Sequence, residues 1–172
     1  MPSVTQRPEI DEVWGWLEQV PDPEIPVISV VDLGIVRDVY YQEDNTLVVA
    51  VTPTYSGCPA TQVINDDIEA ALRAHGVQHL RIERRLSPPW TTDWLSERGR
   101  ERLREYGIAP PVEQAQGGTK SIWVRGDGVR IVPCPRCDST DTKLISHFGS
   151  TPCKSQYQCE SCFEPFDYFK CI

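Results

Sequence analysis

Apolar residues follow two different spacings in the first half of the chain. In two stretches they recur at the spacing that places them on one face of a helix. Between and after these stretches lie short runs rich in valine, isoleucine, leucine and tyrosine, which are typical of strands. The expected elements are a helix at 9–20, strands at 35–41 and 47–51 joined by a turn, a helix from Cys58 to Gly76, and a strand at 77–86. This order indicates a small α+β domain of helix–strand–strand–helix–strand type.

The pattern changes after residue 86. Residues 93–106 are heavily charged and carry few apolar positions, but their composition favours a helix. Prolines and glycines are frequent over residues 109–118, as in a linker. The predicted organisation is a first domain at 1–110, with its core at about residues 8–86 and the charged helix at about 93–106, a linker at 111–119, and a C-terminal module at 120–172.

Two Cys-x-x-Cys pairs lie in the C-terminal module, Cys134 with Cys137 and Cys159 with Cys162. A spacing of two residues lets one tight turn aim both sulfurs at the same ion, and two such pairs can form a tetrahedral cage for zinc or a single iron ion. A module of about 50 residues is too small to fold on an apolar core alone. We therefore predict a zinc ribbon with one structural zinc ion.

Composition narrows the possible functions. The formal net charge is −8, and residues 131–172 hold four basic and five acidic side chains, so no part has the basic excess that nucleic-acid binding requires. The chain has neither an apolar run long enough to span a membrane nor a secretory leader. Seven cysteines in a metal-binding pattern suit a reducing compartment. These features predict a cytoplasmic protein that binds neither nucleic acid nor membrane.

Cys58 lies outside the two pairs and directly precedes Pro59, a residue favoured in the first turn of a helix. A thiol at a helix start receives backbone N–H groups and the helix dipole, which lower its pKa and favour the metal-binding thiolate. The alternative is a buried cysteine that acts as a small apolar side chain. No base is paired with Cys58, and the chain has no phosphate loop or nucleophile elbow, so we expect no catalytic site.

Two further groups of residues leave alternatives open. Asp22 and Glu24 lie on a stiff, proline-rich loop, where they could supply oxygen ligands or only shape the turn. Cys153 and Cys171 have no partner at Cys-x-x-Cys spacing, so they are either ordinary thiols or extra ligands of a composite site with Cys58.

Three segments resemble, in the same order, the SufT-like family of assembly factors for iron–sulfur proteins. They are Asp22-Pro23-Glu24-Ile25-Pro26, Val31-Asp32-Leu33-Gly34-Ile35-Val36 and Thr52-Pro53-Thr54-Tyr55-Ser56-Gly57-Cys58-Pro59. The charged helix and the ending Glu164-Pro165-Phe166-Asp167-Tyr168-Phe169-Lys170-Cys171 resemble one subgroup, the PaaD proteins of phenylacetate degradation.

The resemblance implies an accessory role without catalysis. A protein of this kind would help to insert iron–sulfur clusters, or iron, into the multicomponent phenylacetyl-CoA epoxidase, with Cys58 as the functional thiol of a transient site. The iron–sulfur reductase component would be the client. One thiol cannot hold a cluster, so the other ligands would come from a client, from a second copy in a homodimer, or from Cys153 and Cys171 of the same chain. The alternatives are a structural or regulatory subunit of the oxygenase and a thiol-dependent redox protein.

Overall fold

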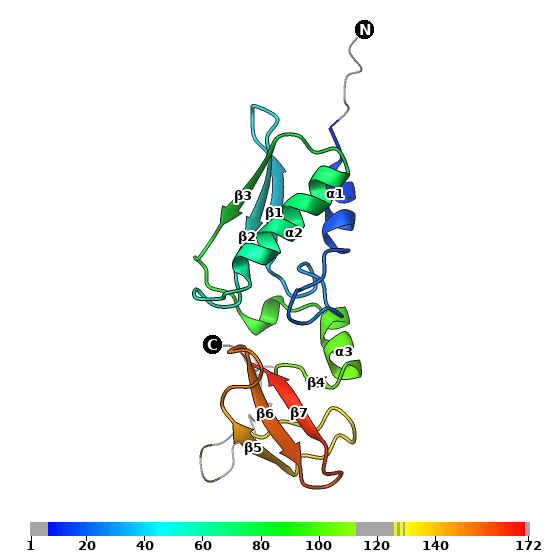
Figure 1. Ribbon diagram of the computed structural model, residues 1–172, viewed down its shortest axis with the longest axis vertical. Coiled ribbons are helices and arrows are strands. Elements are labelled where there is room, and N and C mark those ends of the chain that lie inside the picture. The colour runs from blue at the N-terminus through cyan, green and yellow to red at the C-terminus, as the bar shows by residue number, and fades with distance from the viewer. Residues whose placement is uncertain (1–6, 113–125, 127, 129, 171–172) are drawn as a thin grey trace. The chain divides into compact units, whose positions relative to one another are not determined.

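The computed structural model describes residues 7–112, 126, 128 and 130–170. The chain divides into two compact units, Met1–Trp90 and Thr91–Ile172, which we call unit 1 and unit 2 (Figure 1). Most of the predicted linker at 111–119 lies outside the described residues, as does Cys171. No helix within the described ranges is long and apolar enough to cross a bilayer.

Unit 1 has the order of elements expected from the sequence. These are α1 (Ile10–Leu17), β1 (Val36–Tyr41), β2 (Leu47–Val51), α2 (Thr61–Ala74) and β3 (Leu80–Arg84). β1 and β2 form the predicted antiparallel hairpin, and β3 pairs with β2 in parallel. The pairing is parallel because α2 returns the chain to the end of the sheet where β2 begins. The two helices pack against each other and against the sheet (Figure 1).

β2 is the central strand, and all five of its side chains are buried. Tyr40 on β1 lies opposite Val48, and Glu83 on β3 lies opposite Ala50, so the four side chains share one face. The Tyr40 hydroxyl donates to the Glu83 carboxylate at 3.3 Å, so a side-chain hydrogen bond joins the two outer strands across β2 and covers this face of it. A strand covered on both faces needs an unbroken apolar run, which explains why β2 shows no alternation.

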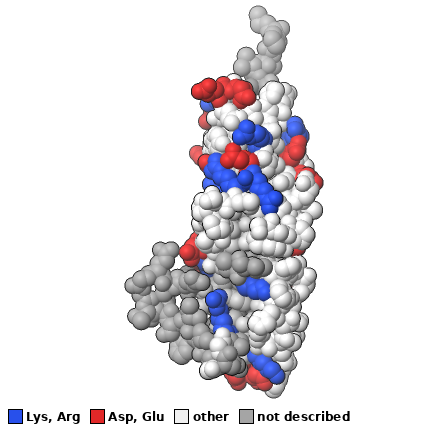
Figure 2. Space-filling view, turned by 90° about the vertical axis from the view of Figure 1, so that its left-hand side faces the viewer, with Lys and Arg blue, Asp and Glu red and all other residues white. Residues whose placement is uncertain are grey.

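Basic and acidic side chains are interleaved on the side of unit 1 seen in Figure 2.

The core of unit 1 is almost wholly aliphatic. Each helix buries the apolar positions that recur at helical spacing, as the sequence predicted. They are Val13 and Leu17 on α1 and Ile64, Ile68 and Leu72 on α2. The loops between α1 and β1 add Ile25, Ile28, Val30 and Leu33, each almost fully buried. Unit 1 therefore has an apolar core that requires no metal.

Unit 2 is a ribbon built on a four-stranded sheet. Its elements are a short 3₁₀ turn at Thr92–Trp94, α3 (Glu97–Glu105), β4 (Ile108–Ala109), β5 (Thr142–Ser146), β6 (Lys154–Cys159) and β7 (Pro165–Phe169). The strand order is β4-β7-β6-β5, with β5, β6 and β7 antiparallel to their neighbours in the chain and β4 parallel to β7.

The charged helix α3 groups with unit 2, whereas the sequence pattern predicts a first domain that includes this helix and ends at residue 110. α3 contacts β4, and β4 extends the ribbon sheet by pairing Ile108 with Asp167 of β7. Arg104 of α3 also forms an ion pair with Asp138 of the ribbon. A two-residue strand followed by prolines has no periodicity, so its pairing could not be recognised in the sequence.

Candidate metal and thiol sites

The four cysteines of the Cys-x-x-Cys pairs converge in unit 2. Their sulfurs all lie within 4.8 Å of one another, and no other group of three or more ligand side chains does so among the described residues. Cys134 Sγ is 3.7 Å from Cys162 Sγ, and Cys137 Sγ is 3.6 Å from Cys159 Sγ. A tetrahedral zinc site with Zn–S bonds of about 2.3 Å requires sulfurs about 3.8 Å apart. The spacing of the sulfurs therefore fits one tetrahedral ion.

In each pair the first cysteine lies in the core and the second lies at the surface. Cys134 and Cys159 are fully buried, and Cys137 and Cys162 are exposed. The two buried cysteines belong to an apolar cluster of the unit, which also contains Ala109, Val132, Tyr157, Phe166 and Tyr168. The first cysteine of each pair therefore packs in the core as well as belonging to the candidate metal site.

The electrostatics of the four sulfurs favour a cation. Burial opposes ionisation of Cys159, but the N–H groups of Cys162 and Ser161 and the neighbouring thiols lower its pKa to about 7. At Cys162 the Glu164 N–H favours the thiolate, but burial and the neighbouring thiols together raise the pKa to about 12. One sulfur thus ionises at the expense of another, because negative charges this close repel each other. A divalent ion would remove that conflict.

Cys58 lies on the loop between β2 and α2, but it does not cap the helix. α2 begins at Thr61 with Ala60 as its cap residue, two positions after the cap residue predicted from the sequence, Cys58. The Cys58 carbonyl accepts hydrogen bonds from the Thr61 N–H at 3.2 Å and the Thr61 hydroxyl at 2.8 Å. A separate turn at Pro59 and Ala60 thus precedes the helix.

The prediction of a lowered pKa for Cys58 was wrong. The thiol is half-buried, and loss of water around it raises its pKa. Hydrogen bonds from Ala60 and Thr61 favour the thiolate, as expected near a helix start, but they are too weak to reverse the shift. The charges of Glu24 and Asp22 raise the pKa further. The sequence pattern showed the donors and could not show the burial or the acidic neighbours.

Asp22 and Glu24 differ in their surroundings. Asp22 is buried, and its Oδ1 accepts hydrogen bonds from the N–H groups of Glu24 at 2.9 Å and Ile25 at 2.8 Å. This carboxylate therefore shapes the proline-rich loop, which was one of the two predicted roles. Glu24 is only half-buried, and both charges act on Cys58. The two carboxylates do not join Cys58 in a set of three closely spaced ligand atoms in the described structure.

The structure brings together the three segments that carried the family resemblance. The Thr52 N–H donates to the Ile35 carbonyl at 2.8 Å, which joins the second segment to the third. The effect of Glu24 and Asp22 on the Cys58 thiol joins the first segment to the third. The segment that carries the thiol is thus linked to both of the other segments, although 25 residues of the sequence separate it from the first.

Two residues outside the predicted site also hold these segments in place. The Arg84 guanidinium, at the end of β3, donates to the Ser56 carbonyl at 2.7 Å and so holds the loop that carries Cys58. The buried Trp90 indole N–H donates to the Leu33 carbonyl at 2.8 Å and fixes the turn of the second segment. Neither contact has a local sequence signal, because each joins segments that are far apart in the chain.

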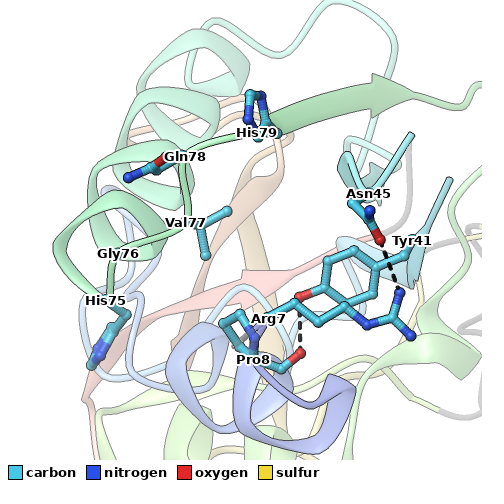
Figure 3. A pocket seen from close by; sticks show the side chains of 9 residues that line it. All are labelled: Arg7, Pro8, Tyr41, Asn45, His75, Gly76, Val77, Gln78 and His79. Atoms are coloured by element: carbon cyan, nitrogen blue, oxygen red, sulfur yellow. Dashed lines mark hydrogen bonds between the residues drawn. The ribbon is translucent and has the colours of Figure 1, made fainter. Parts of the chain in front are cut away.

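A cavity of about 210 Å³ lies elsewhere in unit 1 (Figure 3). Residues 75–79 line it after the end of α2, together with Arg7, Tyr41 and others. Cys58 precedes the start of α2, and the 14 residues of this helix span about 21 Å, so the cavity is separate from the thiol region. His75 and His79 point in different directions, and the His75 ring stacks on Trp16 at 4.2 Å. These histidines do not form a pair.

Two family models match the chain. The model "Iron-sulfur cluster assembly protein" matches residues 10–78, and the model "PaaD zinc beta ribbon domain" matches residues 121–170. An Escherichia coli (strain K12) protein, named as one of the subunits of a "Putative 1,2-phenylacetyl-CoA epoxidase", is 49% identical over 165 residues, which cover 96% of this chain and 94% of that protein. The chain belongs to the PaaD family. The resemblance inferred from the sequence motifs is thereby confirmed.

Other relatives of this PaaD-family chain match its N-terminal part. The Bacillus subtilis (strain 168) "Fe-S protein maturation auxiliary factor YitW" is 38% identical over 87 residues, which cover 50% of this chain and 84% of the relative. The crystal structure titled "Domain of Unknown Function DUF59 from Bacillus anthracis" superposes with a TM-score of 0.50 at 30% identity and covers 54% of this chain and 89% of that one. The predicted α+β fold class with a C-terminal ribbon is confirmed.

Cys153 does not join the four-sulfur group in the described structure. Cys153 is buried in unit 2, and its sulfur is 3.0 Å from the Thr151 hydroxyl. Cys171 is outside the described residues. A composite site of either residue with Cys58 stays a prediction.

Proposed function

We propose that this protein is an accessory factor that helps to insert iron–sulfur clusters, or iron, into a multicomponent phenylacetyl-CoA epoxidase. The iron–sulfur reductase component is the proposed client, and Cys58 is the thiol that takes up the transferred iron or cluster. The observation that carries the proposal is the location of Cys58. It is a half-buried thiol on the loop between β2 and α2, in the third of the three segments that resemble the assembly factors, and this segment is linked to the other two by a hydrogen bond and by the charges of Glu24 and Asp22.

The surroundings of Cys58 suit temporary binding of a metal. Burial and the charges of Glu24 and Asp22 raise the thiol pKa, and an arriving iron ion would reverse both effects by its positive charge. The same carboxylates attract a cation to the loop. Because no set of three ligand atoms includes Cys58 in the described residues, a cluster here needs further ligands from a client or a second copy of the chain. Incomplete ligation favours release, which a transfer site requires.

The ribbon has a different role in this proposal. Cys134, Cys137, Cys159 and Cys162 hold one structural zinc ion, which the sulfur spacing fits and which completes the fold of unit 2. All four protein ligands are supplied by the chain, so no coordination position is left for a substrate. The ribbon thus provides a stable surface and takes no part in cluster transfer.

A second candidate function is that of a structural subunit of the epoxidase. The name of the Escherichia coli relative, which describes a subunit, favours this alternative. Co-purification tests it. A structural subunit remains in the mature epoxidase at fixed stoichiometry, whereas a maturation factor is absent from the active complex.

Deletion of the gene for this protein in a phenylacetate-degrading bacterium tests the proposed function. The epoxidase components should then accumulate with less iron and acid-labile sulfide, and with low activity. A gene for the Cys58→Ser variant should fail to restore them, although this variant folds and keeps its ribbon metal. Fully loaded, active epoxidase from cells that carry Cys58→Ser or Cys58→Ala would contradict the role of this thiol.

A further inference from the structure

Phe163 directly follows the second cysteine of the second pair and has an unusual backbone conformation. Its φ is +61°, in the left-handed region that bulky side chains rarely adopt. In the described part of the chain, the other non-glycine residues with positive φ are Asn45 and Asp138, and both belong to types that tolerate this region. Phe163 is therefore the strained exception.

The geometry of the ribbon imposes this conformation. In the first pair the Cys134 N–H donates to the carbonyl of Ser139 at 2.9 Å, and in the second the Cys159 N–H donates to that of Glu164 at 2.9 Å. Each bond closes a turn over the same number of residues. The residue before each acceptor is left-handed, with φ of +59° at Asp138 and +61° at Phe163. Glycine would fit there without strain, so the turn itself does not require a phenylalanine.

The Phe163 side chain has no packing role that offsets the strain. It is 71% exposed, and among the described residues no ring or cation stacks on it. Phe148, the other strongly exposed phenylalanine of unit 2, differs because the Lys170 ammonium lies over its ring at 4.4 Å. A residue that is both strained and exposed is more often explained by binding than by folding.

We propose that Phe163 anchors this protein to its client by inserting its ring into an apolar pocket with a basic rim. This inference rests on the proposed function, which supplies the client. A rigid turn presents the ring with little loss of conformational entropy, and single aromatic anchors of this kind dominate many interfaces.

The charges around Phe163 support a protein partner rather than a nucleic acid. Glu160 is exposed, and Arg136, the basic residue of the two cysteine turns, forms an ion pair with Glu164 at 3.1 Å. An aromatic ring that stacks on bases is normally accompanied by free basic groups, because the phosphates must be neutralised. The exposed carboxylate of Glu160, which that ion pair leaves uncompensated, instead complements a basic rim on a protein.

Binding of the zinc-loaded full-length protein to each purified epoxidase component, measured by biolayer interferometry, tests the inference. Phe163→Gly should weaken binding to the iron–sulfur component by about tenfold or more. The same variant should keep its zinc and unfold at an equal or higher temperature, because glycine relieves the strain. Phe163→Asn, which also tolerates positive φ, should behave like Phe163→Gly, and the control Phe148→Ala should bind like the original protein.

The inference would be overturned by unchanged affinity of Phe163→Gly, by loss of zinc or of thermal stability in that variant, or by failure of the original protein to bind any of the components. Binding to labelled single-stranded DNA that is lost in Phe163→Gly would also overturn it, in favour of base stacking. Cluster loading in the deletion strain reports on the proposed function separately. Reduced loading with unchanged Phe163→Gly binding would leave that function standing and remove only the anchor.

Discussion

The two units of this PaaD-family protein stay folded in different ways. Unit 1 buries aliphatic side chains from two helices and a sheet, and its candidate functional thiol, Cys58, lies outside that core. Unit 2 has a small apolar cluster that includes Cys134 and Cys159. In unit 1 the thiol thus lies apart from the core, whereas in unit 2 two of the four candidate metal ligands also pack in the core.

Removal of the ribbon metal should have the largest effect on folding, and this effect should be confined to unit 2. Structural zinc contributes about 10 kcal/mol or more to the folding of small zinc modules, so a strong chelator should unfold unit 2. Unit 1 should keep its helices, since its core contains no metal ligand. Amide hydrogen exchange resolved by peptide checks this. Equal loss of protection in both units would show that unit 1 depends on the metal.

Substitutions of the ribbon cysteines sharpen this comparison. Cys137→Ser should abolish tight zinc binding and unfold unit 2 at ordinary temperature. Cys134→Ser should do the same and also place a hydroxyl in the apolar cluster, so excess zinc should rescue it less well. Zinc titration followed by circular dichroism measures both. Equal rescue of the two variants would argue against the packing role of Cys134.

A core substitution in unit 1 should have the converse effect. Leu47 is fully buried in the central strand, so Leu47→Ala should lower the free energy of unfolding of unit 1 by about 2–5 kcal/mol. The zinc content of unit 2 should stay unchanged. Val63→Ala is a matched control, because Val63 is 47% exposed on α2 and should change stability by less than about 0.5 kcal/mol. Urea titration monitored by far-ultraviolet circular dichroism provides the comparison.

Asp22→Ala tests how far the loop beside Cys58 depends on one carboxylate. The substitution removes the acceptor of two backbone N–H groups, so it should cost about 1–3 kcal/mol. Asp22→Asn keeps an oxygen acceptor and should cost less. If thermal unfolding shows that the two variants lose equal stability, the negative charge rather than the hydrogen bonds is what stabilises the loop.

Glu24→Gln should have the smallest effect, confined to the chemistry of Cys58. Burial and the nearby carboxylates raise the thiol pKa, so alkylation should be slow at neutral pH and accelerate only as the pH rises above the ordinary value for cysteine. Removal of the Glu24 charge should lower that pKa and speed alkylation at mildly alkaline pH, without loss of stability. Peptide-resolved mass spectrometry with iodoacetamide measures the rate. A slower reaction in Glu24→Gln would contradict the conclusion that the Glu24 charge raises the pKa of Cys58.

The sequence by itself determined the order of elements in unit 1 and the pairing of the four cysteines. Both are local properties. Helical spacing requires that Ile64, Ile68 and Leu72 share a face, and a Cys-x-x-Cys turn brings its two sulfurs together whatever lies around it. The three motifs around Cys58 likewise identified the family before the fold was known.

Only the tertiary structure decided the surroundings of each group. Each of these depends on residues that are distant in the chain. They include the pairing of β4 with the ribbon sheet, the burial of Cys58, and the hydrogen bonds of Arg84 and Trp90. The pKa of Cys58 shows the physical reason. A local pattern indicates which donors lie beside a thiol, but water exclusion and neighbouring charges depend on how the whole unit packs.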